Sequence, residues 1–70
     1  MTLKELRIAL DLSQNELDRR AGVPRGTTHD LESGRNSDPS TSISLAIVRA
    51  LQESGAKGVD VETIFAERTA

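Results

Sequence analysis

The chain has 70 residues, of which 9 are basic and 11 acidic, and its formal net charge at pH 7 is −2. It has no cysteine, which excludes disulfides and a thiolate zinc site, and its only aromatic residue is Phe65. No apolar run approaches the ~18 residues of a membrane span, and residues 1–20 are too charged for a secretory signal. We therefore expect one small cytoplasmic domain, residues 1–70, with an aliphatic core.

The first predicted helix begins at Thr2. Thr2 and Glu5 have the spacing of a capping box, in which each side chain accepts a hydrogen bond from the backbone N–H of the other residue. Leucines at 3, 6 and 10 recur at helical spacing and predict the buried face of this helix.

The second predicted helix begins at a second capping box, formed by Ser13 and Glu16. Leu17 and Ala21 give it an inward face, and Gly22 predicts a left-handed residue at its end.

The third predicted helix begins at Pro24, because proline is tolerated in a first helical turn, and it runs to Ser33 before Gly34. Two helices joined by a short turn that contains glycine are typical of a helix-turn-helix, here at about 13–34. The stretch "PRGTTHD" supplies the small polar and cationic side chains that a helix in the major groove needs on its exposed face.

Two further helices are predicted after the polar loop "GRNSDPST". One begins after Pro39, with Ser40, Thr41 or Ser42 as its cap, and the other covers about 60–68. The helix after Pro39 has its apolar positions at Ile43, Ile47, Ala50 and Leu51. The helix at about 60–68 has its apolar positions at Val61, Ile64 and Phe65, which either close the core or form a dimer interface. The predicted fold class is all-α, a compact bundle of five short helices.

Three stretches of the chain carry a family resemblance, "LKELRIALDLSQNELDRRAGVPRGTTHDLESGR", "PSTSISLAIVRAL" and "GVDVETIF". Together they resemble the Xre/Cro/phage-repressor type of helix-turn-helix domain. "LSQxEL", "AGV" and "LExG" occur in the order and spacing of that family. The resemblance implies a lambda-repressor-like fold and a DNA-binding regulator, usually a repressor, that acts as a homodimer on a palindromic operator of double-stranded DNA.

The resemblance also implies roles for individual residues. Gln14 occupies a position that reaches a phosphate and supports a base-contacting side chain, and Arg35 is placed for another phosphate. Arg7 and Glu32 match a structural ion pair between the first helix and the end of the third. The base-reading positions correspond to Arg25, Gly26 and Asp30, with Thr27 and His29 beside them.

The sequence departs from the family at several of these places. Pro24 replaces the usual Ser or Thr cap, Gly26 offers no side chain, and Asp30 adds negative charge toward DNA. The family commonly has Ala at the position of Asp18 and a branched apolar residue at that of Thr28. We expect the Asp18 carboxylate to accept a hydrogen bond from the Thr28 hydroxyl or from backbone N–H groups of the third helix.

Two functions from different classes follow from these features. The first is a sequence-specific DNA-binding transcription regulator, and the second is a protein-interaction module, such as an antitoxin-like, anti-repressor or accessory factor. The net negative charge favours the second, because phosphate contacts require basic side chains. We expect no enzyme, no cofactor and no metal site, since His29 and Asp30 alone are a poor ligand set and no nucleophile has a recognisable partner.

Overall fold

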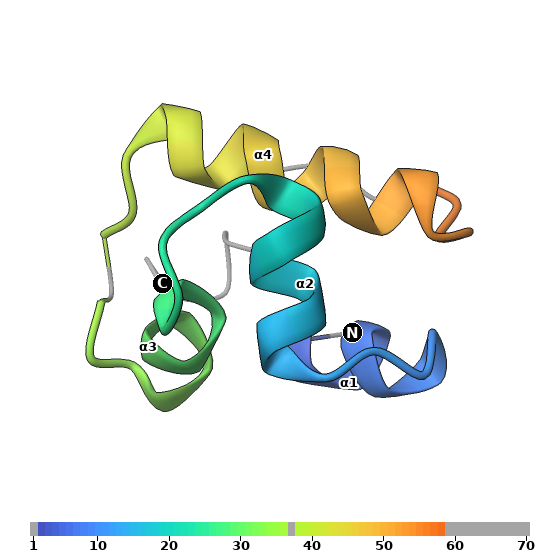
Figure 1. Ribbon diagram of the computed structural model, residues 1–70, viewed down its shortest axis with the longest axis horizontal. Coiled ribbons are helices and arrows are strands. Elements are labelled where there is room, and N and C mark those ends of the chain that lie inside the picture. Colours follow the sequence, from blue (N-terminus) through green and yellow to red (C-terminus); the bar gives the residue numbers. More distant parts are fainter. Residues whose placement is uncertain (1, 37, 59–70) are drawn as a thin grey trace.

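The computed structural model of the protein describes residues 2–36 and 38–58, and every regular element in these ranges is a helix. The helices are α1 (Leu3–Ala9), α2 (Gln14–Ala21), α3 (Thr27–Ser33) and α4 (Thr41–Glu53). Figure 1 shows α2 in the middle, with α4 running across one of its ends and α3 beside it. The all-α prediction is therefore confirmed for these residues, with four helices. The predicted fifth helix, about 60–68, lies outside the described residues, as do the interface candidates Val61, Ile64 and Phe65.

Local capping boxes begin the first two helices, as predicted. At α1, the Glu5 N–H donates to Thr2 Oγ1 at 3.2 Å and the Thr2 N–H donates to Glu5 Oε1 at 2.9 Å. At α2, the Glu16 N–H donates to Ser13 Oγ at 3.0 Å and the Ser13 N–H donates to Glu16 Oε1 at 3.1 Å. Hydrogen bonds from the backbone and side chain of Thr2 lower the pKa of Glu5, since they favour the charged carboxylate.

The end of α1 depends on a left-handed residue that is not glycine. Asp11 has φ 58°, and the chain turns there so that the Leu12 N–H donates to the Arg7 carbonyl at 3.1 Å. This turn satisfies one of the free carbonyls at the helix end and directs Leu12 into the core. Gly22 ends α2 with φ 71°, as predicted.

The predicted start of the third helix at Pro24 is wrong, because α3 begins at Thr27. Gly26 has φ 94° and ψ −7°, the values of the third residue of a type II turn, and the Thr27 N–H closes this turn on the Pro24 carbonyl at 3.1 Å. Arg25 and Gly26 therefore lie in the turn that precedes α3 and not in the helix itself. A positive φ interrupts right-handed helix geometry, so the helix cannot extend back to Pro24.

The core is aliphatic, and it forms where α2 packs against α3 and α4. Leu17, Leu31, Ile47 and Leu51 are fully buried in it. Ser40 is the cap of α4, where its Oγ accepts from the Ile43 N–H at 3.2 Å. The predicted apolar face of this helix is confirmed, because its four positions are buried or packed against the core. None of the helices described is long and apolar enough to cross a membrane.

Candidate nucleic-acid interface

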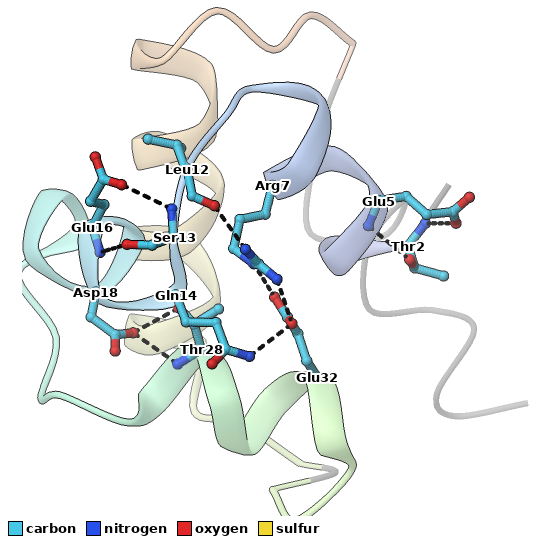
Figure 2. A network of polar contacts seen from close by, with 10 residues as sticks. All are labelled: Thr2, Glu5, Arg7, Leu12, Ser13, Gln14, Glu16, Asp18, Thr28 and Glu32. Carbon is cyan, nitrogen blue, oxygen red and sulfur yellow. Dashed lines mark hydrogen bonds and ion pairs between the residues drawn. The ribbon is translucent and has the colours of Figure 1, made fainter.

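Asp18 on α2 holds the start of α3. Its Oδ1 accepts from the Thr28 N–H at 2.8 Å and from the Thr28 hydroxyl at 2.7 Å, and its Oδ2 accepts from the Gly26 N–H at 2.9 Å. Figure 2 shows the carboxylate of Asp18 directed at Thr28 across the gap between the two helices. Asp18 is 3% exposed and Thr28 is 0% exposed. The predicted contact is confirmed, and the carboxylate uses both the hydroxyl and the backbone N–H groups.

This contact replaces a local cap. Gly26 precedes α3 and has no side chain, so no residue of the turn caps the helix. In a capping box, one side chain accepts from a backbone N–H inside the first turn and another accepts from the N–H of the cap residue. Asp18 does both for α3, from a different helix. A single carboxylate of α2 therefore caps the start of α3.

A second polar network joins α1, α2 and α3 at Glu32. Arg7 Nε donates to Glu32 Oε2 at 2.6 Å, and Arg7 Nη2 donates to Glu32 Oε1 at 3.1 Å. The third nitrogen of this guanidinium, Nη1, donates to the Leu12 carbonyl at 2.7 Å. Gln14 Nε2 donates to Glu32 Oε1 at 3.0 Å, so the Gln14 side chain lies against the ion pair (Figure 2).

The Glu32 carboxylate remains ionised because its partners outweigh its burial. Burial raises the pKa of Glu32, but hydrogen bonds from Arg7 and Gln14 and the positive charges of Arg7 and Lys4 lower it further, so its pKa is below its ordinary value. The side chains of Arg7 and Glu32 are 11% and 6% exposed, which makes this a largely desolvated ion pair. It ties α1 to the last turn of α3.

Arg25 is exposed on the turn between α2 and α3. It borders a shallow hollow of about 380 Å³ that Asn15, Arg19 and Val23 also line. Arg19 is exposed in the last turn of α2. The structure places it on the same hollow as Arg25, so two guanidinium groups border one depression of the surface.

Gln14 and His29 border a second hollow, of about 190 Å³, together with Lys4, Glu32 and Ser33. The structure thus brings together Gln14 and His29, which were singled out separately in the sequence. His29 is exposed on α3, whereas Gln14 is partly buried at the first position of α2.

The remaining candidate residues lie along α3 and just beyond its end. Thr27 is partly exposed, and its hydroxyl donates to the Pro24 carbonyl at 2.6 Å, so this hydroxyl stabilises the turn. Asp30 is partly exposed on the helix, and Arg35 is exposed one residue after the end residue Gly34.

The side chains of residues 1–35 that lie near solvent have a more positive balance of charge than these residues have in total. These residues have six basic and six acidic side chains. Arg7 and Glu32 neutralise each other and Asp18 is buried, which leaves five basic and four acidic side chains near solvent. Two of these acids, Glu5 and Glu16, accept the backbone N–H groups of capping boxes.

Sequence reasoning missed Lys4 as a neighbour of this surface. Lys4 is three residues before Arg7, so the two side chains share one face of α1. Since Arg7 was expected to pair with Glu32 at the end of the third helix, helical spacing could have placed Lys4 on the same side of the first helix. No comparable signal exists for the grouping of Arg19 with Arg25, because that grouping depends on the course of the turn between α2 and α3.

Comparison with known proteins gives a family but no individual relative. Neither the curated proteins nor the solved structures include a significant match to this chain. A family model described as a helix-turn-helix domain matches residues 1–59. Within the residues that the structure describes, the match covers α1 to α4 and therefore the whole α2–turn–α3 unit. The chain therefore belongs to the helix-turn-helix domain family.

Proposed function

We propose that this protein is a sequence-specific, double-stranded DNA-binding transcription regulator of the Xre/Cro/phage-repressor type. The observation that carries the proposal is the exposed Arg25, which lies in the turn two residues before the start of α3 in a helix-turn-helix unit. In such units the second helix enters the major groove, and residues at its N-terminal end contact the base edges. An arginine there can donate to O6 and N7 of a guanine at once.

The other polar residues of this surface divide into base contacts and phosphate contacts. Asp30 accepts from the N4 amino group of a cytosine, and Thr27 and His29 lie beside it along the groove. Gly26 lets the backbone of the turn approach the bases because it has no side chain. Gln14 and Arg35 bind phosphates. Lys4 borders the same hollow as Gln14 and supports this phosphate contact.

We infer the mode of action from the resemblance to dimeric helix-turn-helix repressors. A homodimer places two copies of α3 in successive major grooves ~34 Å apart, on a palindromic operator. Val61, Ile64 and Phe65 are the candidates for the dimer interface. Repression by occupying a promoter requires no cofactor and no enzymatic activity. The protein then acts in the cytoplasm, on the nucleoid.

A protein-interaction module is the second candidate, and two observations favour it. Asp30 is partly exposed on the helix that would face DNA, and the chain has a net charge of −2. Both weaken attraction to a phosphate backbone. An antitoxin-like, anti-repressor or accessory factor would use the same surface to bind a partner protein.

Salt dependence of duplex binding separates the two functions. We would measure binding to a random-sequence duplex by fluorescence anisotropy between about 50 and 200 mM salt, since phosphate contacts release counterions. A DNA-binding regulator loses affinity steeply with salt, and Arg35→Ala lowers the slope by ~1. Arg49→Ala is the matched control, because Arg49 is exposed on α4 and has no assigned contact. Binding that is absent or independent of salt, in folded protein, supports the protein-interaction module.

A further inference from the structure

Arg25 is fixed by backbone contacts on both of its sides. On its N-terminal side, the Pro24 carbonyl accepts from the Thr27 N–H at 3.1 Å and from the Thr27 hydroxyl at 2.6 Å. On its C-terminal side, the Gly26 N–H donates to Asp18 Oδ2 at 2.9 Å. This N–H belongs to the same planar peptide unit as the Arg25 carbonyl, so the bond sets the orientation of that unit.

From this geometry we propose that Asp18 is a positioning residue for DNA specificity. It orients the turn at Pro24–Thr27 and thereby sets the direction in which the Arg25 side chain projects from the surface. The proposal rests on the proposed function of Arg25 as a base reader. It adds a residue that cannot touch DNA itself, because Asp18 is 3% exposed.

The chemistry of the carboxylate suits this role. An ionised aspartate accepts at two oxygens and donates at neither, so it can hold the Gly26 and Thr28 N–H groups together. An asparagine has one accepting oxygen, and its NH2 group would face a donor. Asp18 has no cationic partner among residues 2–36 and 38–58, so three hydrogen bonds stabilise its charge.

The cost of burying this carboxylate makes its effect on the turn geometry separable from its effect on stability. Burying a carboxylate is unfavourable unless it is fully hydrogen-bonded, and apolar side chains of similar shape at two such positions often give equal stability. Ala at 18 and Val at 28 would remove the Thr28 hydroxyl together with its acceptor, but the N–H groups of Gly26 and Thr28 would lose theirs. The two substitutions would leave the turn at Pro24–Thr27 without its anchor.

The decisive variant is therefore Asp18→Ala/Thr28→Val, compared with the parent protein and with Asp18→Asn. Far-UV circular dichroism and thermal melting first establish that each variant is folded at the temperature used. Hydrogen exchange of the Gly26 and Leu31 amides, followed by NMR, then reports on the turn and on the core. We expect Gly26 to exchange at least about tenfold faster in the double variant while Leu31, which is buried in the core, is unchanged.

Base discrimination is the readout that a merely structural role would not change. In duplexes selected by the parent protein, discrimination at the base pair read by Arg25 should fall about tenfold in the double variant, a large part of what one bidentate arginine contact supplies. The salt slope should stay the same, because phosphate contacts are retained. Unchanged Gly26 exchange, or unchanged discrimination despite faster exchange, overturns the proposal.

The two proposals fail in different ways. If the parent protein shows no base discrimination, the DNA-binding regulator is contradicted, and the exchange of Gly26 by itself decides whether Asp18 holds the turn. If the parent discriminates and the double variant does so equally, Arg25 remains a base reader and only the positioning role of Asp18 is lost.

Discussion

Arg7 and Glu32 are 25 residues apart in the chain, and their side chains form two hydrogen bonds of 2.6 and 3.1 Å that join α1 to the last turn of α3. Both side chains are nearly buried. Since α3 is the helix that would enter the groove, the pair also determines how α1 is placed relative to the DNA-facing surface. The same carboxylate holds Gln14.

Removing one partner of this pair should be far more harmful than removing both. Arg7→Met leaves a buried carboxylate whose main charge partner is gone, and we expect the free energy of unfolding to fall by about 3–5 kcal/mol. In Arg7→Met/Glu32→Leu, apolar side chains should restore most of this loss. Urea unfolding of the single and double variants measures both values. Equal destabilisation in the two proteins would contradict this account of the pair.

The lowered pKa of Glu32 predicts loss of stability in acid. Its carboxylate is stabilised in the folded state, so the folded-state pKa is below the unfolded one and the unfolded protein binds protons more readily. The stabilisation is complete above the ordinary pKa of glutamate, about 4.3, and disappears as the pH falls below it through the lowered pKa.

Glu32→Gln tests this dependence directly. The slope of unfolding free energy against pH, between about pH 6 and 3, should be smaller in this variant than in the parent. Glu5→Gln is the control for an exposed capping carboxylate, and it should reduce the slope less because water screens that site. A parent-like slope in Glu32→Gln would show that another group controls acid unfolding.

Asp18→Ala should be strongly destabilising on its own. It leaves the N–H groups of Gly26 and Thr28 without their acceptor, at a cost of about 1–3 kcal/mol for each group that stays unsatisfied. Thr28→Val removes one donor and leaves the carboxylate two others, so its effect should be smaller, ~1 kcal/mol. Thermal melting compares the two. A melting temperature that is unchanged or higher in Asp18→Ala would contradict the capping role.

Asp11 offers a stabilising substitution. It has φ 58° just after the end of α1, where its negative charge meets the negative end of the helix dipole. Asp11→Asn keeps a side chain that tolerates this conformation and removes the charge, so we expect a gain of about 0.3–1 kcal/mol. Asp11→Val should lose about 1–2 kcal/mol, because a branched side chain is strained there. Chemical unfolding that ranks Asn below the parent would refute this reasoning.

Arg25→Ala should change base preference more than general affinity. Loss of a bidentate guanine contact costs ~1–3 kcal/mol on the selected duplex and relaxes preference at one base pair. Arg35→Ala should instead weaken all duplexes alike. Competition binding with single-base-pair changes gives both quantities. If Arg25→Ala binds and discriminates like the parent, Arg25 does not read a base.

The parts of this fold that local sequence signals control could be predicted. The starts of α1 and α2 are set by residues three positions apart, and the apolar face of α4 by helical spacing. The start of α3 could not be predicted, because it depends on the backbone conformation of Gly26, which no neighbouring residue indicates. Pro24 gave a local helix signal, but the positive φ of Gly26 prevents the helix from beginning there.

The candidate site divides in the same way. The Asp18–Thr28 contact could be inferred because two departures from the family pattern fall on positions that pack together. The hydrogen bond from Gln14 to Glu32 was not foreseen, since nothing in the spacing of two polar residues indicates that they share a carboxylate with Arg7. The grouping of Arg19 with Arg25 depends on the path of the turn, which short motifs do not encode.

The measurement that tests the central claim most directly is selection of bound duplexes from a random-sequence DNA pool, at about 100 mM salt, followed by sequencing of the bound fraction. The proposed regulator should enrich an inverted repeat whose half-sites are about one helical turn apart. Arg25→Ala should lose preference at a single position of each half-site. A pool that stays random, selected with protein shown to be folded, would contradict sequence-specific DNA binding and favour the protein-interaction module.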